Sequence, residues 1–135
     1  MKKTLSILLF MVPAFVVNCA PPAPDVTDIR PLAKDFLVAL SRHDTASVLA
    51  RVSDGFLVGI GGEPALAEMM DRYQAYLVPN LFEFDSPLPD GNTYRTRAYL
   101  HDGIRTMLPV DIWVVASGSS WKIDRITWYE PVTER

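Results

Sequence analysis

The spacing of the apolar residues changes near residue 80, and this change restricts the possible folds more than any other feature of the sequence. Before it, apolar residues recur every three or four positions, which is the period of a helix with one buried face. After it, they alternate with polar residues, which is the period of a β-strand. Helices that precede an antiparallel sheet predict an α+β fold, with the helices covering one face of the sheet.

The first half of the chain predicts three helices, at 28–42, from Asp44 to about Val52, and from Glu63 to Pro79. Pro31 falls in the first turn of the first helix, where proline is tolerated. Asp44 can accept hydrogen bonds from the free backbone N–H groups at the start of the second helix. Between the second and third helices, the apolar run FLVGIG at 56–61 predicts a short buried strand.

The second half predicts four strands, at 81–86, 93–101, 104–116 and 121–129. Asp102-Gly103 is a strong signal for a two-residue hairpin loop, which would set Asp111 opposite Tyr94. The serine-rich loop that follows would set Trp113 opposite Asp124. Side chains directly opposite one another lie on the same sheet face. Both faces would then carry apolar residues, although a bulge at Pro109 would exchange them.

One of these faces can be covered by the helices. The other, which we call the outer face, would be left as an apolar patch, and such patches usually mark interaction sites. We therefore expect a homodimer or another protein contact through the outer face.

The N-terminus has the pattern of a bacterial export signal. Lys2 and Lys3 precede an apolar run of 13 residues, 5–17, which Pro13 interrupts. This run is short for a membrane-spanning helix, which needs about 20 residues. Residues 1–18 are therefore predicted to be a signal peptide.

The residues before Cys19 resemble the box of a bacterial lipoprotein signal, although Asn18 replaces the usual small residue. The resemblance implies lipidation of Cys19, the one cysteine of the chain, and a membrane anchor. The alternative is ordinary cleavage after Ala20, which the following proline disfavours. Residues 19–27 would be the lipidated cysteine and a proline-rich tether, and 28–135 a single domain. Ala20 after the cysteine implies the outer membrane of the cell envelope.

Composition excludes several classes of function. The chain has 16 acidic and 13 basic residues and no basic run, which argues against nucleic-acid binding. No zinc-type spacing, P-loop or dinucleotide-binding glycine pattern is present, so no cofactor is expected. The two histidines, His43 and His101, lie far apart in the sequence, so neither a histidine triad nor a metal site is expected.

The order of elements resembles the nuclear transport factor 2-like superfamily, also called the SnoaL-like or ketosteroid isomerase-like fold. The resemblance covers about 28–130 and depends on FLVALSRHDTASVLARVSDGF, on the helix after Gly62 and on the closing WKIDRITWY. It implies a cone, in which a curved sheet wraps the long first helix and leaves a pocket at its open end. Many members dimerise through the outer sheet face.

Among the reactions that members of this superfamily catalyse, steroid isomerisation is the one whose catalytic residues can be compared with this sequence position by position. It needs a general base, and a tyrosine and a neutral acid that stabilise the enolate oxygen. Phe36 stands at the tyrosine position and Ile60 at the base position, and neither can perform these roles. Pro109-Val110-Asp111 matches the segment that carries the acid. The resemblance therefore argues against isomerase activity of that type.

Asp111 is the best candidate for a site residue, because it is the one charged side chain in LPVDIWVV, 108–115. Tyr94 could donate a hydrogen bond to it, and Asp124 would lie diagonally, about 7–8 Å away. Two carboxylates that close in an apolar cone raise one another's pKa, which suits catalysis or ligand binding. The alternative is a structural aspartate that Tyr94, an arginine or water satisfies.

Trp113, Trp128 and Met70 are the other candidate ligand-binding residues, and filling of the core is their alternative role. We expect an exported lipoprotein that binds a small apolar ligand in the cone or a protein on the outer face. A SnoaL-like isomerase, lyase or hydrolase that uses Asp111 and Asp124 is the second hypothesis. A structural dimer of the cell envelope is the third.

Overall fold

The computed structural model describes residues 29–134, which form a helical layer on a six-stranded antiparallel sheet. The α-helices are α1 (Ile29–Ser41), α2 (Thr45–Leu49), α3 (Asp54–Ile60) and α4 (Glu63–Arg72). Two 3-10 turns, Gln74–Tyr76 and Pro79–Leu81, lead into the sheet. The strands are β1 (Phe82–Phe84), β2 (Leu88–Asp90), β3 (Thr93–His101), β4 (Thr106–Ser117), β5 (Ser120–Trp128) and β6 (Val132–Thr133). The α+β architecture predicted from the sequence is confirmed.

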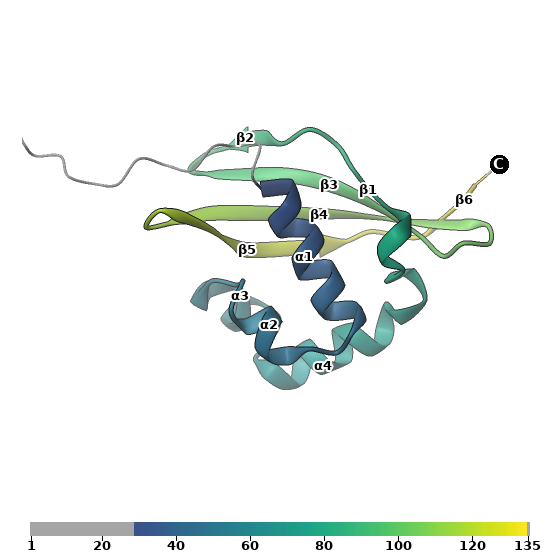
Figure 1. Cartoon of the computed structure of the whole chain (residues 1–135), viewed down its shortest axis with the longest axis horizontal. Coiled ribbons are helices and arrows are strands. Elements are labelled where there is room, and N and C mark those ends of the chain that lie inside the picture. Colours follow the sequence, from purple (N-terminus) through teal and green to yellow (C-terminus); the bar gives the residue numbers. More distant parts are fainter. Residues whose placement is uncertain (1–28, 135) are drawn as a thin grey trace, which may run out of the picture.

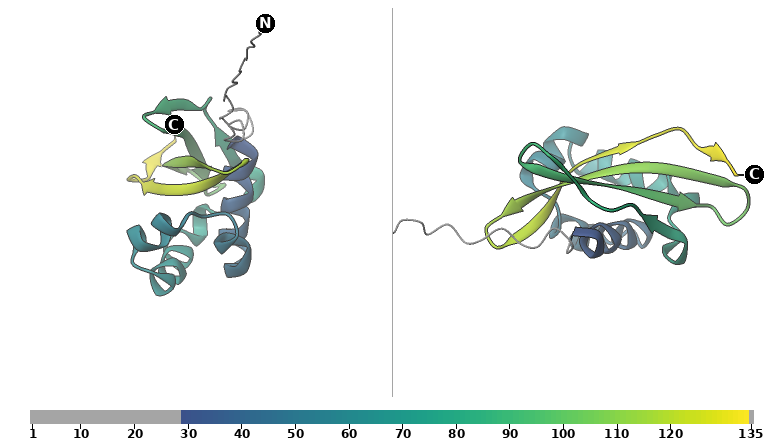
Figure 2. Two further views of the ribbon diagram at one scale, coloured as in Figure 1. Left: turned by 90° about the vertical axis from the view of Figure 1, so that its left-hand side faces the viewer. Right: turned by 90° about the horizontal axis from the view of Figure 1, so that it is seen from above.

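The sheet follows the order β1-β3-β4-β5, with β2 also paired to β3 and β6 to β4. Helix α1 lies across the sheet, and α2, α3 and α4 gather beside β5 (Figure 1). The left view of Figure 2 shows the helices on one side of a twisted sheet. Within residues 29–134, no helix is long and apolar enough to cross a membrane.

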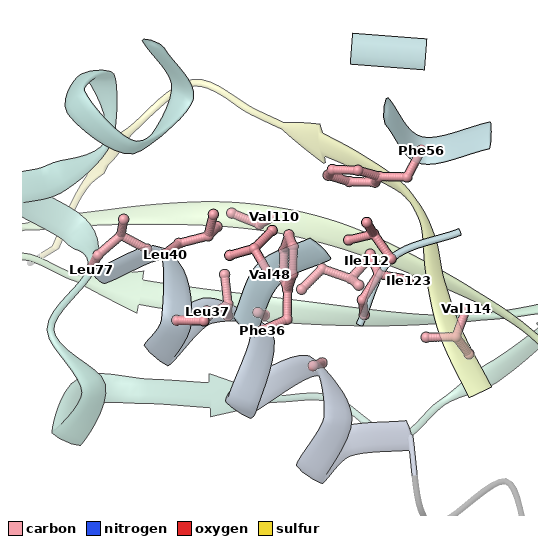
Figure 3. Close-up of a cluster of buried hydrophobic side chains, with 14 of the residues drawn as sticks. Phe36, Leu37, Leu40, Val48, Phe56, Leu77, Val110, Ile112, Val114 and Ile123 are labelled. Atoms are coloured by element: carbon pink, nitrogen blue, oxygen red, sulfur yellow. The ribbon is translucent and has the colours of Figure 1, made fainter. Parts of the chain in front are cut away.

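The core lies between α1 and the sheet, where the side chains of several elements converge (Figure 3). Phe36 of α1 is fully buried and meets the ring of Phe56 from α3 edge to face, with ring centroids 5.7 Å apart. From the sheet, Val110, Ile112 and Ile123 complete this cluster, each with no exposed surface. The periodicity of the first helix predicts this buried face.

The second predicted helix is confirmed as α2, with Asp44 as its cap, because the Asp44 carboxylate accepts a hydrogen bond from the Ser47 backbone N–H. The strand predicted at 56–61 is wrong, since this segment forms α3. The Ser53 hydroxyl accepts from the Phe56 N–H at its start, and Gly61 ends it with a φ of 105°. An apolar run of this length does not distinguish a strand from a short helix.

The two-residue hairpin between β3 and β4 is also wrong. The Asp102 carboxylate accepts hydrogen bonds from three successive backbone N–H groups, those of residues 104–106, and this stabilises a longer loop. Asp111 therefore lies opposite Arg97 instead of Tyr94. A shift of three residues is odd, so it moves every side chain of β4 to the opposite face.

The pairing of β4 with β5 agrees with the prediction at its start and departs from it at a bulge. Ala116 lies opposite Trp121 as expected, but the register shifts between Trp113 and Val114. Trp113 then faces Arg125 instead of Asp124. The outer face is the one that carries Asp111 and Trp113, and it is rich in arginine. The apolar outer face predicted from the sequence is therefore wrong.

Candidate functional site

Asp111 lies on the outer face, with no exposed surface, beneath the side chains of neighbouring strands. Its two oxygens accept hydrogen bonds from Arg97 Nε at 2.7 Å and Arg97 Nη2 at 2.9 Å. The hydroxyl of Tyr129 donates a third at 2.7 Å. Arg95 Nη1 lies 3.5 Å from the same carboxylate. The adjacent strand β3 brings both arginines to this position, because residues two apart share a face.

The ionisation of Asp111 is set by two opposing effects. Burial raises the pKa of its carboxyl, whereas the hydrogen bonds of Arg97 and Tyr129 and the charges of Arg97 and Arg95 lower it, and the net pKa is below the ordinary value. The hydrogen bond to Asp111 raises the pKa of Arg97 and is the main cause of the raised pKa of Tyr129. Asp111 is therefore a carboxylate held by its donors, and the raised pKa expected from the sequence is wrong.

The other candidates for an acid–base site do not join Asp111. Tyr94 lies opposite Val114, with its ring edge-on to Trp121 at 5.5 Å. Asp124 accepts a hydrogen bond of 2.8 Å from the Ser53 hydroxyl, at the start of α3. The observed strand registers explain why neither side chain contacts Asp111. The longer β3–β4 loop moves Tyr94 away from Asp111, and the bulge in β5 moves Asp124 away.

Trp113 is also on the outer face, and so does not line a pocket beneath the helices. The Arg125 guanidinium lies 3.9 Å from the centre of its ring, which is cation–π geometry. Trp113 Nε1 donates a hydrogen bond of 2.8 Å to Asp90. Around Asp111 and Trp113, arginines thus cover a buried carboxylate and a buried indole.

A pocket of about 260 Å³ opens on the helical side of the domain, where α4 approaches β5. Its lining comes from the end of α3, from α4 and from β5, and consists of Ile60, Ala65, Glu68, Met69, Arg72, Tyr73, Ile126 and Trp128. Of the ligand-binding residues predicted from the sequence, Trp128 lines this pocket. Met70 is buried in the core beside it, and its neighbour Met69 takes part in the lining.

Two aromatic rings form one wall of this pocket. Tyr73 and Trp128 are stacked with their centroids 3.9 Å apart and their planes 10° from parallel. The indole N–H of Trp128 is buried and has no hydrogen-bond acceptor within residues 29–134. An unpartnered buried donor costs about 1–3 kcal/mol, so this N–H is a local cost of the packing beside the pocket.

Several pocket residues were not identified from the sequence. On α4, Glu68 and Arg72 lie one turn apart, as do Met69 and Tyr73, so both pairs share one side of the helix. From the sequence alone a core role is expected for Tyr73, because its position continues the apolar face of the helix predicted from Glu63. The i,i+4 spacing indicates that these residues share one side of the helix, but it does not show which strand of the sheet that side faces.

Within the part of the chain that the structure describes, no group of three or more histidine, cysteine, aspartate or glutamate side chains could hold a metal ion. Cys19, the predicted lipidation site, lies outside the described residues, as do the predicted signal peptide and tether.

Comparison with known proteins gives a likeness of fold. No family model matches the chain, and no curated protein matches it. The structure of Bd1075 from Bdellovibrio bacteriovorus is similar, with a TM-score of 0.50 and 15% sequence identity. The match covers 81% of this chain and 41% of that protein, so this chain corresponds to less than half of Bd1075. At this identity the likeness shows the fold alone, a coarse α+β arrangement of helices on an antiparallel sheet.

Proposed function

We propose that this chain is an envelope-anchored lipoprotein that binds a small apolar ligand in the pocket between α4 and β5. The observation that carries the proposal is the aromatic and aliphatic lining of that pocket, with the stacked Tyr73 and Trp128 at its side. Small-molecule sites are typically concave, mainly apolar and provided with a few polar groups. Glu68 and Arg72 supply such groups in the lining.

We further propose that the domain is a nuclear transport factor 2-like cone. The order of its elements supports this, with α1 across one side of the sheet and strands following the helices. The position of the pocket supports it too, since Ile60 aligns with the base of the isomerases and belongs to the lining. The enzyme hypothesis has less support, because Asp111 and Asp124 are bound to different partners.

The binding proposal can be tested by filling the pocket. Ala65→Phe adds a ring to a lining residue, and Ala67→Phe adds the same ring to an exposed position of the same helix. Native mass spectrometry of the domain, purified from its own cells, would report a retained small molecule. We expect that molecule in the unaltered chain and in the Ala67→Phe variant, and its loss from the Ala65→Phe variant. Equal retention by both variants would refute binding in this pocket.

The lipid anchor has an independent test. In a bacterial host fed labelled palmitate, the full chain should incorporate the label and fractionate with the outer membrane. The Cys19→Ser variant should lose the label and the membrane association. Label that persists in this variant, or its absence from the unaltered chain, would contradict lipidation at Cys19.

A further inference from the structure

The pocket between α4 and β5 has two opposite charges at its edge. Glu68 and Arg72 are its charged lining residues, and both are exposed. They are spaced i,i+4 on α4, with the glutamate nearer the N-terminus, which is the favoured orientation for an ion pair between neighbouring turns. Nevertheless, within residues 29–134 neither side chain forms an ion pair, with the other or with any third group. Each therefore presents an unneutralised charge beside the pocket.

The interior of the same pocket is apolar and small. Ile60, Met69 and Ile126 provide aliphatic and thioether surface, next to the Tyr73–Trp128 stack. Its volume of about 260 Å³ lies just below the range of about 300–1,000 Å³ that is typical of drug-sized ligands. The apolar part of a ligand would thus be one ring or one branched chain.

The two edge charges restrict which small ligands suit this pocket. A simple anion would pair with Arg72 but be repelled by Glu68. A simple cation would pair with Glu68 but be repelled by Arg72. A ligand with both charges satisfies both residues, and discrimination between ligands depends on such repulsive contacts as much as on attractive ones. The pocket therefore combines selection for an apolar body with selection for paired opposite charges.

We propose that the ligand is a small zwitterion with an apolar body, of the class of an aromatic or branched α-amino acid. Its ammonium group pairs with Glu68, its carboxylate pairs with Arg72, and its side chain lies against the apolar lining beside Tyr73 and Trp128. This inference depends on the proposed binding function and specifies the ligand class of that same pocket.

The test uses four probes that share a benzene ring and differ in charge. L-phenylalanine carries both charges, 3-phenylpropionate carries the negative one, phenethylamine the positive one, and toluene none. Exposed ion pairs are individually weak, so the expected preference is moderate: by calorimetry, L-phenylalanine should bind about tenfold more tightly than each other probe.

Charge-removing variants then assign each end of the ligand. Glu68→Gln should weaken L-phenylalanine several-fold and strengthen 3-phenylpropionate, whereas Arg72→Gln should weaken L-phenylalanine and strengthen phenethylamine. Asp71→Asn removes a charge from the same helix outside the lining and should leave all four affinities unchanged.

The outcomes separate this inference from the proposed function. If toluene binds as tightly as L-phenylalanine, and neither edge variant alters the order, the zwitterion is excluded while apolar binding in the pocket stands. If no probe binds, and native mass spectrometry finds no ligand that Ala65→Phe displaces, both proposals fail. Tighter binding of L-phenylalanine that depends on both Glu68 and Arg72 supports both.

Discussion

Asp111 and Arg97 share two hydrogen bonds, but the loss of one partner has a different consequence from the loss of the other. Asp111 has no exposed surface, whereas the Arg97 side chain is 39% exposed. Without Asp111, the guanidinium can turn towards water. Without Arg97, the carboxylate stays buried with a weaker set of donors, Tyr129 and the more distant Arg95. Loss of one partner of a buried pair is costly mainly because of the charge left behind.

We therefore predict that Arg97→Gln destabilises the domain by about 3 kcal/mol at pH 7. Arg95→Gln is the matched control, because Arg95 is 3.5 Å from the carboxylate and 38% exposed, and it should cost less than about 1 kcal/mol. Urea denaturation of the three proteins measures both values. Equal losses of unfolding free energy in the two variants would show that the bidentate contact of Arg97 stabilises the domain no more than the longer contact of Arg95.

The same variant should change how stability depends on pH. In the unaltered chain the lowered pKa of Asp111 contributes stability above the ordinary carboxyl pKa, and this is lost as pH falls through the lowered value. In Arg97→Gln, burial dominates and raises that pKa, so stability falls as pH rises through it. The difference in unfolding free energy between the two proteins should therefore shrink between pH 7 and about pH 4. A constant difference would contradict the assignment.

At the scale of elements, α3 depends on one serine. The Ser53 hydroxyl accepts a hydrogen bond from the Phe56 N–H and donates one to Asp124, while the Ser53 backbone N–H donates to the Ile123 carbonyl. These contacts connect the start of the helix to β5. They also give Asp124, a candidate acid in the sequence analysis, a structural role.

Ser53→Ala should destabilise the domain by about 1–2 kcal/mol, the usual cost of losing a helix cap. Ser53→Thr retains the hydroxyl and should recover most of this loss. Chemical denaturation of both variants gives the comparison. If Asp124→Asn, which keeps an acceptor oxygen, alters ligand retention without altering stability, then Asp124 acts at a site and its structural assignment is wrong.

The sequence predicts elements better than it predicts how they pair. The helical period of α1, the Asp44 cap of α2 and the bounds of β3 follow from residue type and spacing alone. The β3–β4 pairing depends on whether Asp102-Gly103 forms a tight turn. The Asp102 carboxylate instead stabilises a longer loop. The longer loop shifts the β3–β4 register by an odd number of residues, and this moves every side chain of β4 to the opposite face of the sheet.

Prediction of the candidate site fails for the same reason. The sequence singles out Asp111 as a lone charge in an apolar strand, but its burial and its partners depend on the register. Trp128, a candidate ligand-binding residue, lines a pocket on the helical side, because the two shifts in register, of three residues and of one, together leave its face relative to β3 unchanged. The pocket itself requires the placement of α4 against β5, and no local pattern in the sequence specifies that distance.

The whole molecule is held by one core that connects helices far apart in sequence. Phe36 and Phe56, from α1 and α3, meet edge to face within it. Aromatic pairs of this geometry contribute about 0.5–1.5 kcal/mol beyond the surface they bury. The separate helices are thus energetically coupled through the core.

A double-mutant cycle can measure this coupling. Phe36→Leu and Phe56→Leu keep apolar volume, so each variant should fold with reduced stability. The combined loss should fall short of the sum of the single losses by about 0.5–1.5 kcal/mol, as measured by thermal or urea unfolding. Strict additivity would show that the two rings contribute independently.

The two sides of β4 are covered in different ways, one by a helix and the other by side chains. Val110, Ile112 and Val114 pack under α1, whereas Asp111 and Trp113 are covered by the sheet's own arginine and tyrosine side chains, and all five are buried. Water is thus kept from both sides of the strand, although residues 29–134 provide no second layer of secondary structure over the outer face. Deuterium should enter the amides of 110–114 only when the entire domain opens, long after the exposed strand β6 has exchanged.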